Sequence, residues 1–309
     1  MKKINYYILL FLLSTSLNAQ SIYEFLKLDL SPRAAALAGS FVSTNDDPNV
    51  ILYNPAGISY LSERPISVSY LNHLLDINFM GAVYSQEIEG LGRFAAAVTY
   101  TNYGSFTEAD EFGTKLGEFG ASDLLMTVGY SNELDQNFYY GANIKFIYSG
   151  IADYSSTGLA FDLGLSYAMP EFDLYFGFSA LNIGSQLSTY AGTSESLPLD
   201  VRVGVSKKLT RTPFKLFLSL NKLNESADSF GDRFQNFTFG TEIKLGTSFN
   251  IRIGYDNEKR KELKIGSSTG LSGISFGVGF AVSEYVVDYA YSSLGSIGAL
   301  HRFGLSTSL

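Results

Sequence analysis

Two histidines are the only imidazole side chains in this sequence that could take part in acid–base or metal chemistry. A hydrolase of the Ser–His type needs a serine and a third, orienting group beside the ring. His73 falls in an expected loop and His301 begins an expected strand, while serines occur along the whole chain, so the spacing selects no nucleophile. Two histidines without carboxylates at ligand spacing also make no zinc motif. We therefore expect no enzymatic activity, no metal site and no cofactor.

A second candidate for chemistry is the oxygen-rich stretch Asn45-Asp46-Asp47-Pro48-Asn49. Its side chains could suggest a calcium site, but they do not follow the order of a complete calcium loop. Asn and Asp next to proline are frequent in turns, because their side chains hydrogen-bond to nearby backbone. The stretch therefore predicts an acidic turn containing Asp46 and Asp47.

Composition and the N-terminal residues restrict the class of protein. Lys2, Lys3 and the apolar run from Ile8 to Leu13, followed by Ala19, predict a secretory signal peptide over residues 1–19, which we leave out of the fold. The net charge of −8, which becomes −10 without Lys2 and Lys3, speaks against binding to nucleic acid. Cysteine is absent, so disulfides and thiolate chemistry are excluded.

From about residue 66 onward, apolar and small or polar residues alternate with a period of two, which predicts strands. In Leu159–Tyr167, Leu159, Phe161, Leu163, Leu165 and Tyr167 share one face, and small residues with Asp162 share the other; Phe276 and Phe280 belong to a similar pattern. A soluble sandwich would expose Lys, Glu and Thr, whereas here the second face carries Gly, Ala, Ser and single charges (Lys145, Asp162, Arg202, Glu242 and Asp288). We therefore expect lipid on the bulky face and a polar lumen on the other, with tyrosines such as Tyr100, Tyr148, Tyr167, Tyr255 and Tyr291 at the membrane interfaces.

The lengths of the connections support this interpretation. The expected strand cores are residues 66–70, 78–87, 93–103, 123–133, 138–149, 157–168, 172–183, 200–209, 214–223, 237–245, 249–256, 273–282, 285–292 and 300–308. Links after even strands are short, and most links after odd strands are longer, including 104–121, 184–198, 223–235 and 257–272, although 259–268 could be an extra strand or part of a loop. This rhythm is typical of an all-β transmembrane antiparallel β-barrel of about 14 strands in the outer membrane of a Gram-negative bacterium, with both termini periplasmic. We assign residues 65–309 to the barrel.

Residues 20–64 lack the alternation and precede the barrel. Ser31-Pro32 predicts the start of a short helix that stops at Gly39. In the motif Asn54-Pro55-Ala56-Gly57, Asn54 either caps another short helix or forms an Asx-type turn into the first strand. The segment is too short to build a core of its own. We therefore predict a small N-terminal plug that folds into the lumen.

One further acidic group lies in the longest expected outer loop and comprises Glu108, Asp110, Glu111 and Glu118. A solvated loop is the simplest interpretation. Alternatively, these carboxylates contact a basic partner, or divalent cations that bridge them to lipopolysaccharide. We treat the four residues as candidate extracellular partner contacts.

The sequence also resembles a known family. SPRAAALAG, STNDD and NPAG, in this order behind a signal peptide, are similar to FadL-like outer-membrane barrels, and especially to the PorV/PorQ family of the type IX secretion system. The similarity continues through YTNYGSF, ADEFG, FGASD, GANIKFIYS, YSSTGLAFDLGLSY and LPLDVRVGVSKKL, and it is closer to PorQ. The chain departs from many outer-membrane barrels in ending on Leu309 rather than on an aromatic residue.

The resemblance implies a 14-stranded FadL-like barrel with a plug. It also implies a role in protein secretion, assisting the export or surface attachment of proteins that bear a C-terminal signal domain. The implied partners are outer-membrane lipid and lipopolysaccharide, translocon or attachment-complex proteins, and the exported substrates. The alternative is a FadL-like transporter of long-chain fatty acids or other hydrophobic small molecules.

Overall fold

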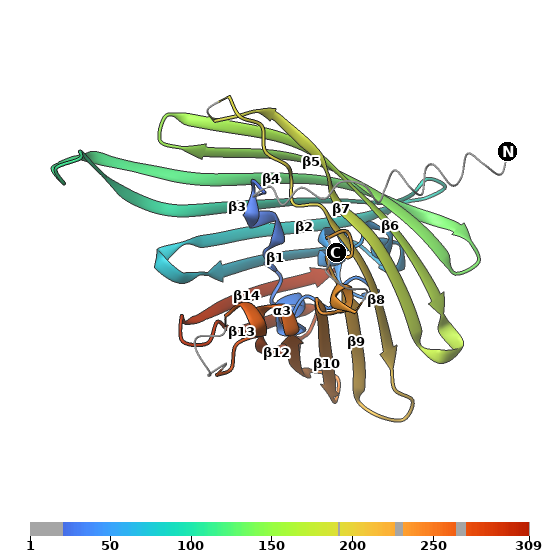
Figure 1. Ribbon diagram of the computed structural model, residues 1–309. Coiled ribbons are helices and arrows are strands. Elements are labelled where there is room, and N and C mark those ends of the chain that lie inside the picture. The colour runs from blue at the N-terminus through green and yellow to red at the C-terminus, as the bar shows by residue number, and fades with distance from the viewer. Residues whose placement is uncertain (1–20, 191, 226–230, 264–269, 309) are drawn as a thin grey trace.

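The protein is described by a computed structural model over residues 21–190, 192–225, 231–263 and 270–308. The expected signal peptide, residues 1–19, lies outside the described residues. Fourteen antiparallel strands form one closed barrel, because β14 pairs with β1 (Figure 1). This confirms the expected fold class. The strands are β1 Pro65–Asn72, β2 Asn78–Ile88, β3 Gly92–Ala109, β4 Lys115–Asp135, β5 Phe138–Ile151, β6 Tyr154–Met169, β7 Leu174–Ser188, β8 Asp200–Lys208, β9 Phe214–Leu220, β10 Phe237–Leu245, β11 Phe249–Asp256, β12 Ile274–Val282, β13 Tyr285–Ser293 and β14 Ala299–Ser308.

The bulky face of the strands points away from the lumen, as expected. The side chains of Leu163 and Phe276 are 53% and 42% exposed, whereas Asp162, next to Leu163 in β6, is fully buried inside. Aromatic side chains also belong to this outer face, including Phe161 and Phe276. Near the short turns, the rings of Phe249 and Phe280 are 4.7 Å apart. An apolar outer surface of this kind matches the hydrocarbon core of a bilayer.

Parts of two expected loops are extensions of strands. Residues 104–121 were expected to form a loop, but β3 continues to Ala109 and β4 begins at Lys115, so the hairpin reaches beyond its neighbours (Figure 1). The stacked rings of Phe106 and Phe119, with centroids 5.4 Å apart, support it. Similarly, β7 continues to Ser188. These extensions were missed because polar and small residues occupy both faces where a strand leaves the bilayer, so the alternation fades.

Between β11 and β12, the chain forms helix α3, Asn257–Glu262, whose first turn is capped by Asp256 through a 3.0 Å hydrogen bond from the backbone N–H of Lys259. This region was expected to hold an extra strand or a loop. Its remainder, 264–269, lies outside the described residues.

The segment before β1 lies within the ring of strands (Figure 1). It comprises α2, Pro32–Ala36, and four-to-six-residue 3-10 helices: η1 Glu24–Lys27, η2 Pro48–Leu52 and η3 Pro55–Tyr60. Further 3-10 turns are η4 Leu74–Asp76, η5 Pro170–Phe172 and η6 Asp232–Phe234. Helix α2 packs against β11–β14, and η3 packs against β3–β6 on the facing wall. The segment therefore spans the lumen from wall to wall.

The two ends of the described chain lie at opposite rims of the barrel. β14 ends at the rim of short turns, but the backbone N–H of Ile22 donates to the carbonyl of Ser196 in the β7–β8 connection, at the rim of long loops. Both ends had been expected on the short-turn side. The expectation assumed that the N-terminal segment enters and stays at one rim, whereas it runs through the lumen.

Among the described residues, every helix is too short or too polar to span a bilayer.

We expect Leu163→Arg to destabilise the barrel by about 2–4 kcal/mol, because it places a cation in hydrocarbon near the middle of β6. Urea unfolding in lipid vesicles measures the change. Phe112→Arg, at the exposed tip of the β3–β4 hairpin, is the matched control and should change stability by less than about 0.5 kcal/mol. Equal effects of the two substitutions would contradict a lipid-facing position for Leu163.

Candidate functional site

We call residues 21–64 the plug, and the candidate site is the contact between the plug and the inner wall. The side chain of Asn54 contributes to this contact on both sides, plug and wall. It is fully buried, and its Oδ1 accepts a 3.1 Å hydrogen bond from the backbone N–H of Ala56, which caps η3. Its Nδ2 donates to the carbonyl of Val42, at 2.9 Å, and to that of Leu165 in β6, at 3.0 Å. The Asn-Pro-Ala-Gly motif therefore forms a short capped helix and joins the plug to the barrel.

Glycines on the inner wall let the plug backbone approach closely. A Cβ atom on Gly141 would lie 2.5 Å from the backbone nitrogen of Ala56, and one on Gly254 would lie 2.5 Å from that of Ala38. Real Cβ atoms do not come so close to backbone, so these positions require glycine. On both β5 and β11, the plug backbone thus lies against the wall where no side chain would fit.

The acidic turn forms ion pairs with basic side chains of the plug and of the wall. Asp47 caps η2 by accepting a 2.8 Å hydrogen bond from the backbone N–H of Asn49. Arg33 of α2 lies 2.9 Å from Asp46, 3.6 Å from Asp47 and 2.9 Å from Glu242 of β10. Asp46 is also 3.2 Å from Lys215 of β9. The turn is therefore a structural part of the plug and its anchorage.

A buried ionic network extends from this turn along the wall. The carboxylate of Glu242 is shared by Arg33 and by Arg252 of β11, whose Nε is 2.6 Å away. Arg252 in turn lies 2.5 Å from Asp288 of β13. One buried carboxylate thus joins the plug to the second half of the barrel, and because every charge in the network has a partner, the desolvation penalty of burying it is offset.

The two carboxylates of the turn differ in their pKa. Burial alone would raise the pKa of Asp46, but Arg33 and then Lys215 favour its ionised form and bring the pKa well below its usual range. Burial raises the pKa of Asp47, and the more distant Arg33 only partly opposes this. The cations around the turn therefore stabilise the ionised form of Asp46 more than that of Asp47.

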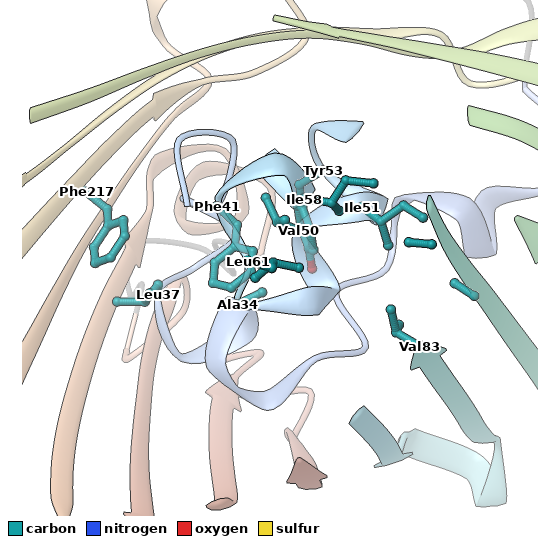
Figure 2. Close-up of a cluster of buried hydrophobic side chains, with 12 residues drawn as sticks. Ala34, Leu37, Phe41, Val50, Ile51, Tyr53, Ile58, Leu61, Val83 and Phe217 are labelled. Carbon is teal, nitrogen blue, oxygen red and sulfur yellow. The ribbon is translucent and has the colours of Figure 1, made fainter. Parts of the chain in front are cut away.

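The plug was expected to be too short to build a core of its own, and it shares an apolar core with the wall. Phe41, Val50 and Ile58 pack together at its centre (Figure 2). Wall side chains complete the cluster, with Phe217 of β9 on one side and Val83 of β2 on the other. The core forms only because the barrel supplies its borders.

A small internal cavity of about 40 Å³ remains between residues 25–30 and the wall. Its apolar side includes Phe25, Leu30 and Leu181, and its polar side includes Lys145 and Asn182. None of the described residues 54–61 lines this cavity. This cavity therefore has space for no more than a few water molecules.

The polar side of this cavity contains a cluster that the sequence did not reveal. A bulge in β7 turns Leu181 and Asn182 inward together, which breaks the alternation. The backbone N–H of Asn182 donates to Asp162 of β6 at 2.8 Å, and Lys145 of β5 lies 2.8 Å from the same carboxylate. The lumen charges Lys145 and Asp162 had been expected inside, but the bulge that brings Asn182 to them leaves no signal in a period-two pattern.

The four candidate partner contacts lie on the protruding hairpin. Glu108 is on β3 and Glu118 is on β4, and Ser105 donates to Glu118 at 3.0 Å. Asp110 accepts hydrogen bonds from the backbone N–H groups of Thr114 and Phe112, at 2.8 and 3.0 Å, which lower its pKa. Asp110 therefore shapes the turn, while Glu108, Glu111 and Glu118 are exposed.

The histidines lie apart from the plug contacts described above. His301 of β14 points outward and its Nδ1 is 2.8 Å from the hydroxyl of Tyr289. His73 packs against Phe79, with ring centroids 5.9 Å apart. Both rings thus have packing or hydrogen-bond roles in the wall and its loops.

The barrel with its helical plug is similar to solved structures of outer-membrane channels. The Ralstonia pickettii toluene transporter TbuX matches with a TM-score of 0.61 over 91% of this chain and 98% of its own, at 11% identity. This fold is FadL-like. A Pseudomonas aeruginosa FadL homologue gives a TM-score of 0.55 over 90% and 97% of the two chains, at 12% identity, and the Pseudomonas putida toluene transporter TodX gives 0.52 over 89% and 97%, also at 12%. No protein-family model matches this FadL-like chain, and no curated protein sequence does.

We expect Glu242→Ala to destabilise the FadL-like barrel by about 3–5 kcal/mol, because Arg33 and Arg252 would keep buried charges without their shared partner. Equilibrium unfolding in detergent measures this. Glu284→Ala, in an exposed turn, should cost less than about 0.5 kcal/mol. A double-mutant cycle with Arg33→Ala should show that the two losses are not additive; additive losses would mean that the pair contributes little.

We expect Gly254→Val to displace the plug while the barrel stays folded, because its side chain would overlap the backbone at Ala38. Hydrogen exchange of residues 31–60 should rise by at least about tenfold. Gly120→Val is the control, since a Cβ there lies 3.6 Å from its nearest neighbour in the outer hairpin, and it should leave exchange in the plug unchanged. Unchanged exchange in both variants would contradict close packing at Gly254.

Proposed function

We propose that this protein is an outer-membrane channel of a Gram-negative bacterium that admits hydrophobic small molecules. The observation that carries the proposal is its FadL-like barrel with an internal plug, since the similar solved structures include toluene transporters. The apolar belt on the outer wall supports a position in the membrane. The apolar lining that Phe25, Leu30 and Leu181 give to the internal cavity supports the class of ligand.

Passage requires part of the plug to move. A cavity of about 40 Å³ is too small for a benzene ring, which fills an engineered cavity of roughly 150 Å³. Residues 25–30 form one side of the cavity, and their polar contacts with the barrel include Asp29, whose carbonyl accepts a 2.6 Å hydrogen bond from Arg302 of β14. Residues 31–64 are held by Asn54, Arg33 and the wall glycines. We assign the movement to residues 25–30.

Uptake of radiolabelled toluene by cells that make the protein, compared with cells carrying an empty vector, tests the channel. We expect faster uptake with the protein and at least about a tenfold loss in Leu28→Asp, which places a charge in the apolar lining. Leu75→Asp, in an exposed outer loop, is the control and should transport normally. Uptake no faster than with the vector would reject the proposal.

An engineered disulfide distinguishes movement of residues 25–30 alone from movement of the rest of the plug, residues 31–64. The hydroxyls of Ser59 in η3 and Ser131 in β4 are 2.5 Å apart, so cysteines at these two positions can be bridged in a chain that has no other cysteine. We expect the oxidised Ser59→Cys/Ser131→Cys variant to keep at least half of the uptake. Complete loss of uptake on oxidation, with recovery on reduction, would show that residues 31–64 must also move away from the wall.

A second candidate function is a role in type IX secretion. The observation that favours it is the combination of a braced, filled lumen with a long acidic hairpin bearing Glu108, Glu111 and Glu118, which suits docking more than conduction. In this case the hairpin contacts translocon or attachment-complex proteins, exported substrates, or lipopolysaccharide through divalent cations.

Deletion of the gene tests this second function. Proteins with a C-terminal signal domain should accumulate in the periplasm, and replacement of the three exposed glutamates by glutamine should reproduce part of the defect. Normal export in the deletion strain, together with lost uptake of hydrophobic molecules, would leave only the channel.

A further inference from the structure

A second cavity, of about 330 Å³, opens at the rim of long loops, and it contains an unbalanced negative charge. Asp123 of β4 forms part of its lining and is only 5% exposed. The described residues include six buried carboxylates, of which Asp47, Asp162, Asp200, Glu242 and Asp256 each form an ion pair with Lys or Arg. In this part of the chain, Asp123 is the exception.

Neutral hydroxyls hold the Asp123 carboxylate in place. Tyr103 of β3 donates to its Oδ2 at 2.5 Å, and Ser149 of β5 donates to its Oδ1. Tyr190 donates in turn to Ser149 at 2.5 Å. These bonds orient the carboxylate but supply no positive charge, and each oxygen keeps a free acceptor position. Burial of an ionised carboxylate without a cation costs free energy that a bound cation would recover.

The remaining lining favours an organic cation over a metal ion. Rings of Tyr23, Tyr103 and Phe106 line the cavity together with the aliphatic side chains of Ile22 and Ile151. Aromatic faces attract ammonium groups, and apolar walls accept a hydrocarbon body. The lining has a second carboxylate, Glu24, paired with Lys27 at 2.9 Å, and it has no Lys or Arg of its own among the described residues.

We propose that this cavity is a binding site for amphipathic organic cations, in which Asp123 receives a protonated amine or quaternary ammonium group and the aromatic rings hold the apolar body. The site is distinct from the internal cavity at residues 25–30, and only the outer one has an unpaired acid. The proposal concerns binding and holds whether or not the ligand crosses the membrane, so it does not depend on the proposed transport.

Calorimetric titration of the purified full-length protein in a neutral detergent tests the site with three probes of similar shape: 2-phenylethylammonium, 2-phenylethanol and 3-phenylpropanoate. We expect the ammonium probe to bind at least about tenfold more tightly than the alcohol, and the carboxylate probe not to bind. Asp123→Asn should weaken the ammonium probe by roughly tenfold to a hundredfold, the range for a hydrogen bond to a charged group. Asp153→Asn, an exposed acid in the neighbouring β5–β6 turn, should leave binding unchanged.

A second variant tests the place of binding independently of the charge. Ala121 lines the cavity and is half-buried, so Ala121→Trp should fill the space and abolish binding of the ammonium probe while the barrel melts at its usual temperature. Equal affinity for the ammonium and alcohol probes, no binding of the ammonium probe, or unchanged affinity in folded Asp123→Asn would each overturn the proposal.

Discussion

Hydrocarbon offers no hydrogen-bond partner to a peptide group, and this constraint explains most of the architecture. Each of the fourteen strands is paired on both sides, and the β1–β14 ladder leaves no edge in the membrane. A closed ring of this size encloses a space that must be filled or hydrated. Here the fill is the chain's own N-terminal segment, whose backbone groups are satisfied by capping side chains and by the wall. Asn54 does both, since its amide serves η3 and the carbonyl of Leu165.

The inner wall contacts the plug in two different ways. Glycines such as Gly141 and Gly254 remove side chains where backbone meets backbone, and charged residues such as Glu242 reach out where the plug carries Arg33. Glu242 and Arg33 are both buried, so either charge would be costly without its partner. This explains why the lumen face of the strands is rich in small residues and yet carries isolated charges, which a soluble sandwich would place on its surface. The outer cavity departs from this balance only at Asp123.

The sequence predicted the parts of the structure that repeat or that are local. Strands from Asn78 to Ser308 were placed within a few residues in the bilayer region, because a half-lipid, half-lumen strand must alternate. The caps Ser31 and Asn54 were found from their position before proline. Contacts between distant residues were not predictable: Arg33 and Glu242 are 209 positions apart, and nothing local links them. The β7 bulge, the hairpin extension and the position of Asp123 in a cavity also depend on neighbouring strands that a single sequence does not name.

The path of the N-terminal segment has a consequence for biogenesis. Arg33 lies in the N-terminal segment, whereas the acids and arginine that complete its network belong to β10, β11 and β13, which are synthesised much later. During assembly, the first helices lack these wall partners until the final hairpins arrive, so their docking includes a loop-closure cost. Docking of α2 can therefore follow only after the barrel is nearly complete. A docked α2 then indicates a molecule in which β14 has already paired with β1.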